Sequence, residues 1–137
     1  MNPLVEERQS PVAGRGLFAT TALPAGTVVL RPASPVHESG PVNHGCDPNL
    51  GWAGEDLVTL RDVAAGEELL VDYAMSTTDP AYYLRCHCPS YRCRQMVEGT
   101  DWRIPQLQER YAGRWSPEVE RLLRGRADGE SQGLPRR

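Results

Sequence analysis

The stretch that decides the fold is NHGCDPN, residues 43–49, because it contains one of only four cysteines in the chain. The other three form the spacing Cys-x-Cys-x4-Cys and begin at Cys86, 40 residues after Cys46. One sulfur in one motif and three in another are typical of a zinc site that joins two distant segments. We therefore expect one structural zinc ion, with the ligands Cys46, Cys86, Cys88 and Cys93.

The four cysteines also permit two disulfides or unpaired thiols. The N-terminus has no apolar segment of signal-peptide length, and no stretch is long and apolar enough to span a membrane. We therefore expect an intracellular protein, cytoplasmic or, in a eukaryotic source, nuclear. A reducing compartment disfavours disulfides, which leaves zinc ligands or free thiols.

Length and charge restrict the class of protein. A chain of 137 residues with 39% hydrophobic content fits one domain with a modest core, in which a metal cross-link adds useful stability. The net charge of -3 and the interspersed charges argue against direct nucleic-acid binding, which needs a basic face. They slightly favour a basic protein partner. The sequence names neither a substrate protein nor an oligomeric state.

The first half of the chain has the pattern of a mainly β fold. Short apolar runs between Val5 and Pro32 alternate with turn formers, which predicts short strands. Residues 33–41 are rich in proline, glycine and serine and have almost no core residues, so we expect a loop. A hairpin is predicted over residues 50–60, turned at 53–56, and a further strand is predicted over 67–73.

The second half predicts helices. Asp79-Pro80 has the cap and first-turn pattern of a short helix over the two tyrosines that follow. Apolar residues recur at three and four positions in 104–111, and Ser116-Pro117-Glu118 starts a second helix that we expect to end near Gly125. The polar tail, residues 126–137, is predicted to be disordered.

Four blocks of this chain closely resemble the SET-domain protein lysine methyltransferases and follow the family's order. They are GRGLFA at 14–19, NHGCDPN at 43–49, GEELLVDY at 66–73, and the cysteine trio at 86–93 followed by Arg94. The chain looks most like small bacterial members that have a post-SET zinc-binding segment.

The resemblance implies a fold and a division of the chain. It implies a SET-type, β-clip-like fold of short-stranded sheets, with a knot-like crossing that places Tyr73 beside Asn43 and His44. The division is a SET core at 5–75, shortened between 30 and 43, a post-SET zinc segment at 76–100, C-terminal helices at 101–125 and a disordered tail at 126–137.

The function implied by the resemblance is methyl transfer from S-adenosylmethionine to a lysine of a protein substrate. Such an in-line displacement needs the methyl donor and a neutral amine held collinear, so positioning supplies most of the effect. A buried tyrosine hydroxyl with backbone carbonyls can align the amine, and the resemblance implies Tyr73 for this role. By its residue type alone, Tyr73 is better explained as a half-buried tyrosine that anchors a strand end, and the resemblance reverses that preference.

The resemblance assigns the cofactor to the glycine turn and to the start of the NHGCDPN stretch. Glycines at 14 and 16 let the backbone pass close to a ligand, although a G-x-G pattern is often only a turn. A loop histidine is often a structural residue. The expected cofactor-binding residues are Gly14, Arg15, Gly16, Asn43 and His44.

The zinc site implies further roles for nearby residues. Four sulfurs about 3.8 Å apart cannot come from a regular strand, so the chain must bend around the metal at Cys86 and Cys88. His87, trapped between them, then points away, and Arg92 and Arg94 are expected to donate to the thiolates or to offset the negative charge of a four-thiolate site. The aromatic residues Trp102, Tyr111 and Trp115 are expected to be core contacts of the C-terminal helices, with covering of the adenine as the alternative.

Two departures from the family leave the function open. Gly45 stands where a serine or threonine is usual, and the segment between Leu30 and Asn43 lacks a long insert that forms one wall of the substrate groove. Trp52, Tyr82 and Tyr83 are candidates to replace that wall. A non-catalytic, zinc-stabilised interaction module is the alternative to an active enzyme, and a redox-sensing zinc switch is a third interpretation.

Overall fold

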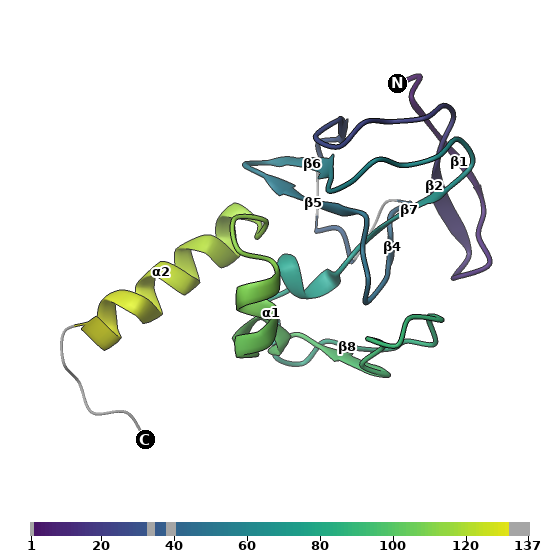
Figure 1. The fold of residues 1–137 in the computed structure, drawn as a ribbon. Coiled ribbons are helices and arrows are strands. Elements are labelled where there is room, and N and C mark those ends of the chain that lie inside the picture. Colours follow the sequence, from purple (N-terminus) through teal and green to yellow (C-terminus); the bar gives the residue numbers. More distant parts are fainter. Residues whose placement is uncertain (1, 33–34, 38–40, 132–137) are drawn as a thin grey trace.

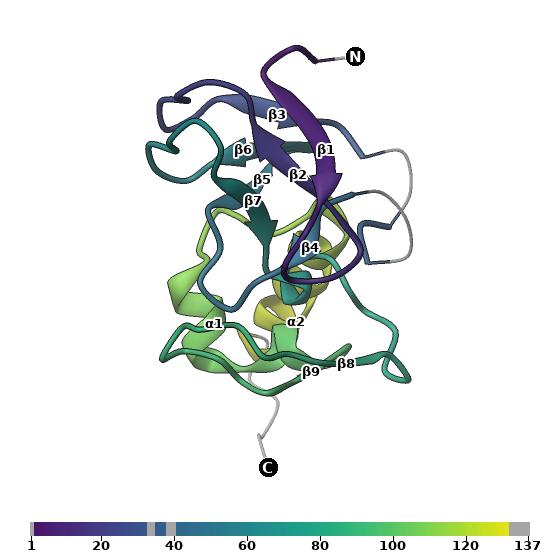
Figure 2. The ribbon, with the colours of Figure 1, turned by 90° about the vertical axis from the view of Figure 1, so that its right-hand side faces the viewer.

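The computed structural model describes residues 2–32, 35–37 and 41–131. Figures 1 and 2 show a β layer with a second layer of a short hairpin and helices against one end of it. Among the described residues, seven strands form one sheet. In chain order these strands are β1 (Val5–Gln9), β2 (Arg15–Ala19), β3 (Val28–Leu30), β4 (Asn43–His44), β5 (Leu50–Ala53), β6 (Asp56–Thr59) and β7 (Glu68–Val71).

Strand β7 is the centre of the sheet. The strand order is β1-β2-β7-β5-β6-β3, and β4 also pairs with β7. β7 is antiparallel to β2 and parallel to both β4 and β5. Its inward residues, Leu69 and Val71, are completely buried, as an apolar strand between neighbours requires.

The hairpin predicted over residues 50–60 is confirmed. β5 and β6 pair with Ala53 opposite Asp56, and Gly54 in the turn has a φ of +61°, which glycine adopts without steric cost. The predicted strands at 17–19, 27–30 and 67–73 correspond to β2, β3 and β7. The mainly β fold class is therefore correct.

The second layer follows β7. It consists of the 3-10 helix η1 (Tyr73–Met75), the antiparallel hairpin of β8 (Tyr83–Arg85) and β9 (Met96–Glu98), the 3-10 helix η2 (Asp101–Arg103), α1 (Pro105–Arg110) and α2 (Pro117–Ser131). The predicted helix over 104–111 is α1. α2 starts at Pro117 as predicted, with the Ser116 hydroxyl accepting from the Val119 N–H at 3.3 Å.

Two helix predictions were wrong. Asp79 and Pro80 begin a turn instead of a helix, because the Tyr82 N–H closes on the Asp79 carbonyl at 3.0 Å and β8 starts at the next residue. α2 continues through Gly125 to Ser131, where an end near Gly125 was expected. The rest of the predicted tail, residues 132–137, lies outside the described residues.

The two layers share one hydrophobic core. It extends from Leu50 and Leu69 in the sheet through Met75 of η1 to Trp115 and Val119. The loop over 33–41 was expected to contribute almost nothing to this core, and of its described residues Val36 is buried in it. No helix in the described part of the chain has the length and hydrophobicity that crossing a bilayer requires.

Candidate active site and metal centre

Strands β4 and β7 bring Asn43, His44 and Tyr73 together. Asn43 pairs with Leu70 and His44 with Val71, so the end of β7 places Tyr73 directly beyond His44. The Tyr73 N–H donates to His44 Nδ1 at 3.0 Å. The sequence predicted this proximity across thirty residues, and the knot-like crossing from which it was inferred stays a prediction.

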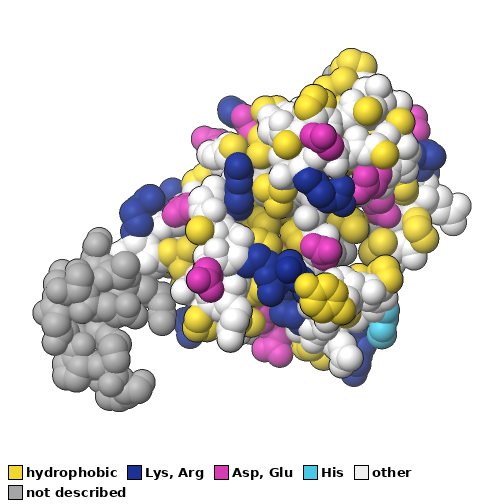
Figure 3. Space-filling model, viewed as in Figure 1, with side chains coloured by type: hydrophobic (Ala, Val, Ile, Leu, Met, Phe, Trp, Pro, Cys, Tyr) yellow, Lys and Arg dark blue, Asp and Glu magenta, His cyan; other side chains and the backbone are white. Residues whose placement is uncertain are grey.

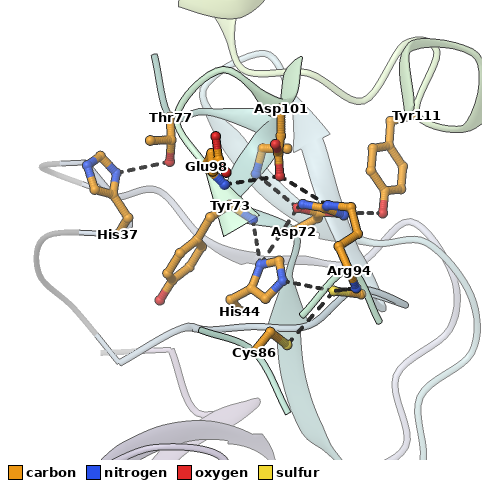
Figure 4. Close-up of polar contacts among 12 residues, drawn as sticks. His37, His44, Asp72, Tyr73, Thr77, Cys86, Arg94, Glu98, Asp101 and Tyr111 are labelled. Carbon is orange, nitrogen blue, oxygen red and sulfur yellow. Dashed lines mark hydrogen bonds and ion pairs between the residues drawn. The ribbon is translucent and has the colours of Figure 1, made fainter. Parts of the chain in front are cut away.

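Tyr73 lies at the start of η1 with its hydroxyl inside the protein. It is 8% exposed, and its hydroxyl donates to the Val42 carbonyl at 2.7 Å. Burial, aided by the neighbouring Tyr82, raises the pKa of Tyr73, so the side chain is a neutral phenol at neutral pH. Its ring centroid lies 5.3 Å from that of His44 and 6.4 Å from that of His37 (Figure 4).

His44 connects Tyr73 to the cysteines. Because Nδ1 accepts from Tyr73, the neutral ring carries its proton on Nε2, which donates to Cys46 Sγ at 3.3 Å. Burial lowers the pKa of His44 to about 4, so its 3.7 Å approach to the Asp72 carboxylate is not an ion pair at neutral pH. These hydrogen bonds fit the structural role that the sequence left open for His44, and its predicted contact with the cofactor stays a prediction.

Asn43 points the other way, toward the glycine turn. Its Nδ2 donates to the carbonyls of Ala13 at 2.9 Å and Arg15 at 3.1 Å. Opposite directions for Asn43 and His44 follow from the alternation of side chains along a strand. The structure thus joins Asn43 to the turn that includes Gly14 and Gly16, and separates His44 from it.

The two glycines of the turn differ in their surroundings. Gly14 has a φ of +44° and open space where a Cβ would lie, so backbone conformation requires it. A Cβ on Gly16 would overlap Glu68 Oε2, so Gly16 is needed for close approach to that carboxylate. The Arg15 side chain is exposed and lies 3.8 Å from the Glu7 carboxylate on β1.

Gly45 has a packing explanation. A Cβ at this position would lie 3.0 Å from Leu70 Cδ1 and 3.2 Å from Leu70 Cβ. A serine or threonine would therefore press on β7, and glycine relieves the contact. Asn49 has a φ that is not positive. Its side chain instead holds β7 by donating to the Glu68 carbonyl at 2.9 Å and accepting from the Leu70 N–H at 2.8 Å.

The four cysteines predicted to bind zinc lie together. All four Sγ atoms fall within 4.8 Å of one another, and those of Cys46 and Cys86 are 3.8 Å apart, close to the spacing of two sulfurs on one tetrahedral zinc ion. None is in a disulfide. β8 ends at Arg85, so the chain leaves the strand before Cys86, and His87 is exposed, as predicted.

The electrostatic environment of the four cysteines favours a bound cation. Burial raises the pKa of Cys46 and raises that of Cys86 to about 11, so clustered thiolates without a cation are unfavourable here. The Arg94 N–H also points at Cys46 Sγ, at 3.4 Å. The set can hold one metal ion with four sulfur ligands, which is the donor set of a structural zinc site.

Of the two roles expected for Arg92 and Arg94, side-chain donation to the sulfurs is not what the described residues show, whereas the charge of Arg94 acts to lower the pKa of Cys46, as an offsetting charge does. The Arg94 guanidinium turns from the cysteines and forms a two-point ion pair with Asp72, at 2.7 and 2.9 Å, and a further bond to Asp101 at 3.1 Å. The Arg92 side chain stacks on Tyr91 and lies 3.9 Å from Asp47. Aspartates are better partners because they are ionised without a metal.

Sequence reasoning missed the network that Asp72 organises. This carboxylate is fully buried, and it also accepts from the Tyr111 hydroxyl at 2.8 Å and the Ala74 N–H at 2.9 Å (Figure 4). Burial raises the pKa of Asp72, but the bonds and charge of Arg94 outweigh it and hold the pKa below its usual range. Tyr111 is a core residue, as are Trp102 and Trp115. The only signal in the sequence was that Asp72 and Arg94 belong to recognised blocks.

Of the three candidate wall residues, Tyr82 lies close enough to Tyr73 to raise its pKa. The Tyr82 ring meets that of His37 edge-on at 4.7 Å, and the His37 Nδ1 lies 3.2 Å from the Thr77 hydroxyl. Tyr83 is 69% exposed. Trp52 is buried and lines a separate cavity of about 420 Å³ between the sheet and the start of α2.

Charged side chains of both signs lie on one face of the molecule (Figure 3), and the expectation that the chain does not bind nucleic acid directly stays a prediction. In the view of Figure 3, acidic and basic side chains are interspersed over the sheet and the C-terminal layer. That face of the molecule therefore has no continuous basic surface of the kind that binds a nucleic-acid backbone.

Comparisons with known proteins point to one class of enzyme, the histone-lysine methyltransferases. The chain is 32% identical over 74 residues to histone-lysine N-methyltransferase ash1 of Drosophila melanogaster, which covers 48% of the chain. It is 31% identical over 64 residues (41% of the chain) to histone-lysine N-methyltransferase 2D of Homo sapiens, and 35% identical over 68 residues (44%) to ATX2 of Arabidopsis thaliana. No protein-family model matches the chain.

The similarity is partial. The matched stretch is 3%, 1% and 6% of the length of these three relatives, so the chain corresponds to a small part of each. Somewhat under half of the chain is thus related in sequence to histone-lysine methyltransferases. This agrees with the SET-domain resemblance and supports lysine methyltransferase function at the level of the family.

Proposed function

We propose that this chain is an S-adenosylmethionine-dependent protein lysine N-methyltransferase of the SET type. The observation that carries the proposal is the convergence on β4. Asn43 on one side of this strand binds the glycine turn, and His44 on the other side binds both Tyr73 and Cys46. The Arg94 N–H, directly after the cysteine trio, donates to Cys46 Sγ at 3.4 Å, so the other three recognised blocks all meet the NHGCDPN stretch through direct hydrogen bonds.

The proposed roles follow from these positions. The cofactor would supply the methyl group. The glycine turn and Asn43 would hold it, with the turn's amide groups available to a carboxylate. The Tyr73 hydroxyl and the Val42 carbonyl, already 2.7 Å apart, offer two oxygen atoms that can orient a lysine amine in a water-poor site. The aromatic ring of Tyr82 would help to wall the amine channel.

The proposed zinc ion is structural. Four cysteine ligands leave no open position for substrate, so the ion would hold the segment that includes Cys86, Cys88 and Cys93 against β4. Because Cys46 lies two residues from His44, the ion stabilises the strand that positions Tyr73. The proposed substrate is a lysine of a basic protein, and the proposed type is the small bacterial one.

Titration calorimetry with S-adenosylmethionine tests the proposal. Binding with a dissociation constant below about 1 mM, together with transfer of radioactive methyl groups to lysine in a mixture of basic proteins, is the expected result. If titration with millimolar S-adenosylmethionine releases no heat, the proposed methyltransferase function is refuted. An excess of unlabelled S-adenosylmethionine should suppress the radioactivity that comes from enzymatic methyl transfer and not the radioactivity that is adsorbed to the proteins.

Two observations favour the alternative of a non-catalytic module. The Tyr73 hydroxyl is already satisfied by Val42, and the segment between β3 and β4 is short. A chain that binds zinc and folds cooperatively, yet binds no cofactor and transfers no methyl group, would support this alternative. The same calorimetric titration therefore decides between the two.

A further inference from the structure

Glu68, the first residue of β7, has an unusual environment for a carboxylate. It accepts from the Ser10 hydroxyl at 3.0 and 2.8 Å and from Asn43 Nδ2 at 3.1 Å, and it is partly buried. Within the described ranges, no basic side chain forms an ion pair with it. Its charge is therefore stabilised by neutral donors.

The neighbouring acidic residues are different. Glu67 pairs with Arg61 at 2.7 Å. Three further acidic residues of the sheet each pair with an arginine of their own. These pairs are Glu6 with Arg8, Glu7 with Arg15, and Asp56 with Arg31. Glu68 thus stands out as a partly buried anion next to the glycine turn without a cation.

The position of the carboxylate is built by the fold. A Cβ at residue 16 would overlap Glu68 Oε2 and lie 2.9 Å from Ser10 Cβ, so only glycine leaves room for the carboxylate there. The same Asn43 Nδ2 that binds Glu68 also binds the carbonyls of Ala13 and Arg15. Glu68 is therefore fixed against the turn rather than free in solvent.

A fixed, partly buried carboxylate attracts a cation, because the low local dielectric strengthens the interaction and water screens it less. S-adenosylmethionine has two cationic groups, an α-ammonium and a sulfonium. If amide groups of the turn take its carboxylate, the α-ammonium lies close by, since both groups are attached to one carbon atom.

We propose that Glu68, within the GEELLVDY block, binds the α-ammonium group of the cofactor. The inference rests on the proposed function, because it requires the cofactor to occupy the glycine turn. Ser10 and Asn43 act as positioning residues that hold the Glu68 carboxylate toward the ligand.

The test compares Glu68→Gln with Glu67→Gln by titration calorimetry. Glutamine keeps an acceptor for Ser10 and Asn43 but removes the charge. Loss of a charge-assisted hydrogen bond predicts that Glu68→Gln weakens binding of S-adenosylmethionine about tenfold or more. S-adenosylhomocysteine keeps the ammonium and lacks the sulfonium. Glu68→Gln should therefore weaken binding of S-adenosylhomocysteine by the same factor as binding of S-adenosylmethionine. Glu67→Gln, whose carboxylate faces Arg61, should bind within about twofold of the unsubstituted protein.

A second measurement compares two ligands on the unsubstituted protein, and this comparison survives a folding defect in Glu68→Gln. An analogue of S-adenosylhomocysteine that lacks the amino group should bind the unsubstituted protein about tenfold more weakly, and Glu68→Gln should show no such preference. Equal affinity of the unsubstituted protein for both ligands would overturn the inference.

The remaining outcomes are also decisive. Unchanged cofactor affinity in Glu68→Gln overturns the inference and leaves the proposed function intact. Weakening for S-adenosylmethionine alone would mean that Glu68 faces the sulfonium, which overturns the assignment to the ammonium. If the unsubstituted protein binds neither ligand, the proposed function fails and this inference fails with it.

Discussion

Arg94 donates two hydrogen bonds to the carboxylate of Asp72, at 2.7 and 2.9 Å. This ion pair connects the cysteine segment to the candidate catalytic tyrosine. Arg94 directly follows Cys93, and Asp72 directly precedes Tyr73. The same carboxylate binds Tyr111 beyond α1, so one buried anion connects the sheet, the metal segment and the C-terminal helices. The position of Tyr73 therefore depends on the segment that follows it in the chain.

Replacing Arg94 by methionine should destabilise the protein by about 3–5 kcal/mol, because it leaves Asp72 buried without its cation. Chemical denaturation at neutral pH with saturating zinc measures this cost. Arg92→Met is the matched control, since Arg92 is exposed, and it should change the free energy of unfolding by less than about 0.5 kcal/mol. Equal effects of the two substitutions would show that the ion pair contributes nothing.

The cost of Arg94→Met should shrink as the pH falls. In the native protein the pKa of Asp72 is below its usual value of about 3.9, so the stability from the ion pair is present above that pH and is lost below it. Without Arg94, burial raises the pKa of Asp72, and protonation relieves the buried charge. Denaturation at pH 7 and pH 5 should therefore give a smaller difference between variant and unsubstituted protein at pH 5. A constant difference would contradict this.

Elemental analysis should find one zinc ion per chain, and Cys46→Ser should lose it. His87→Ala is the control, because this exposed residue between two ligands should leave zinc content unchanged. Zinc affinity should fall as the pH falls, since protons compete for thiols whose pKa burial raises. If Cys46→Ser still binds zinc tightly, the prediction that the ion connects Cys46 to the later cysteine segment is refuted.

Tyr73→Phe should lower the rate of methyl transfer by about a hundredfold or more while cofactor affinity stays near normal, because the hydroxyl acts on the amine and not on the cofactor. Tyr83→Phe removes the same atom from a side chain that is 69% exposed and should leave the rate unchanged. Transfer of radioactive methyl groups and calorimetry measure the two quantities. Undiminished turnover in Tyr73→Phe would refute its role.

Alanine substitutions separate the two glycines of the turn. Gly14→Ala should cost about 1–2 kcal/mol of stability, because a φ of +44° is unfavourable for alanine, with little effect on the cofactor beyond that. Gly16→Ala should displace the Glu68 carboxylate and weaken cofactor binding in the same direction as Glu68→Gln. Thermal denaturation and calorimetry on both variants check this. Equal cofactor affinity in the two variants would contradict it.

The parts of the fold that the sequence predicted are those set by local chemistry. The turn at Gly54 and the start of α2 at Pro117 depend on residues within a few positions of one another. Predictions failed where distant packing decided. Asp79 closes a turn because the chain must enter β8 at Tyr83.

The sequence by itself determined the four cysteines as one set and the order of the recognised blocks, because residue type and spacing carry that information. Only the tertiary structure decided the partners of the charged and polar groups. Arg94 reaches Asp72 across 22 residues and Ser10 reaches Glu68 across 58, and neither pairing has a local signature. The physical reason is that a buried charge takes whichever partner the fold brings within about 3 Å, and that choice is made by packing and not by periodicity.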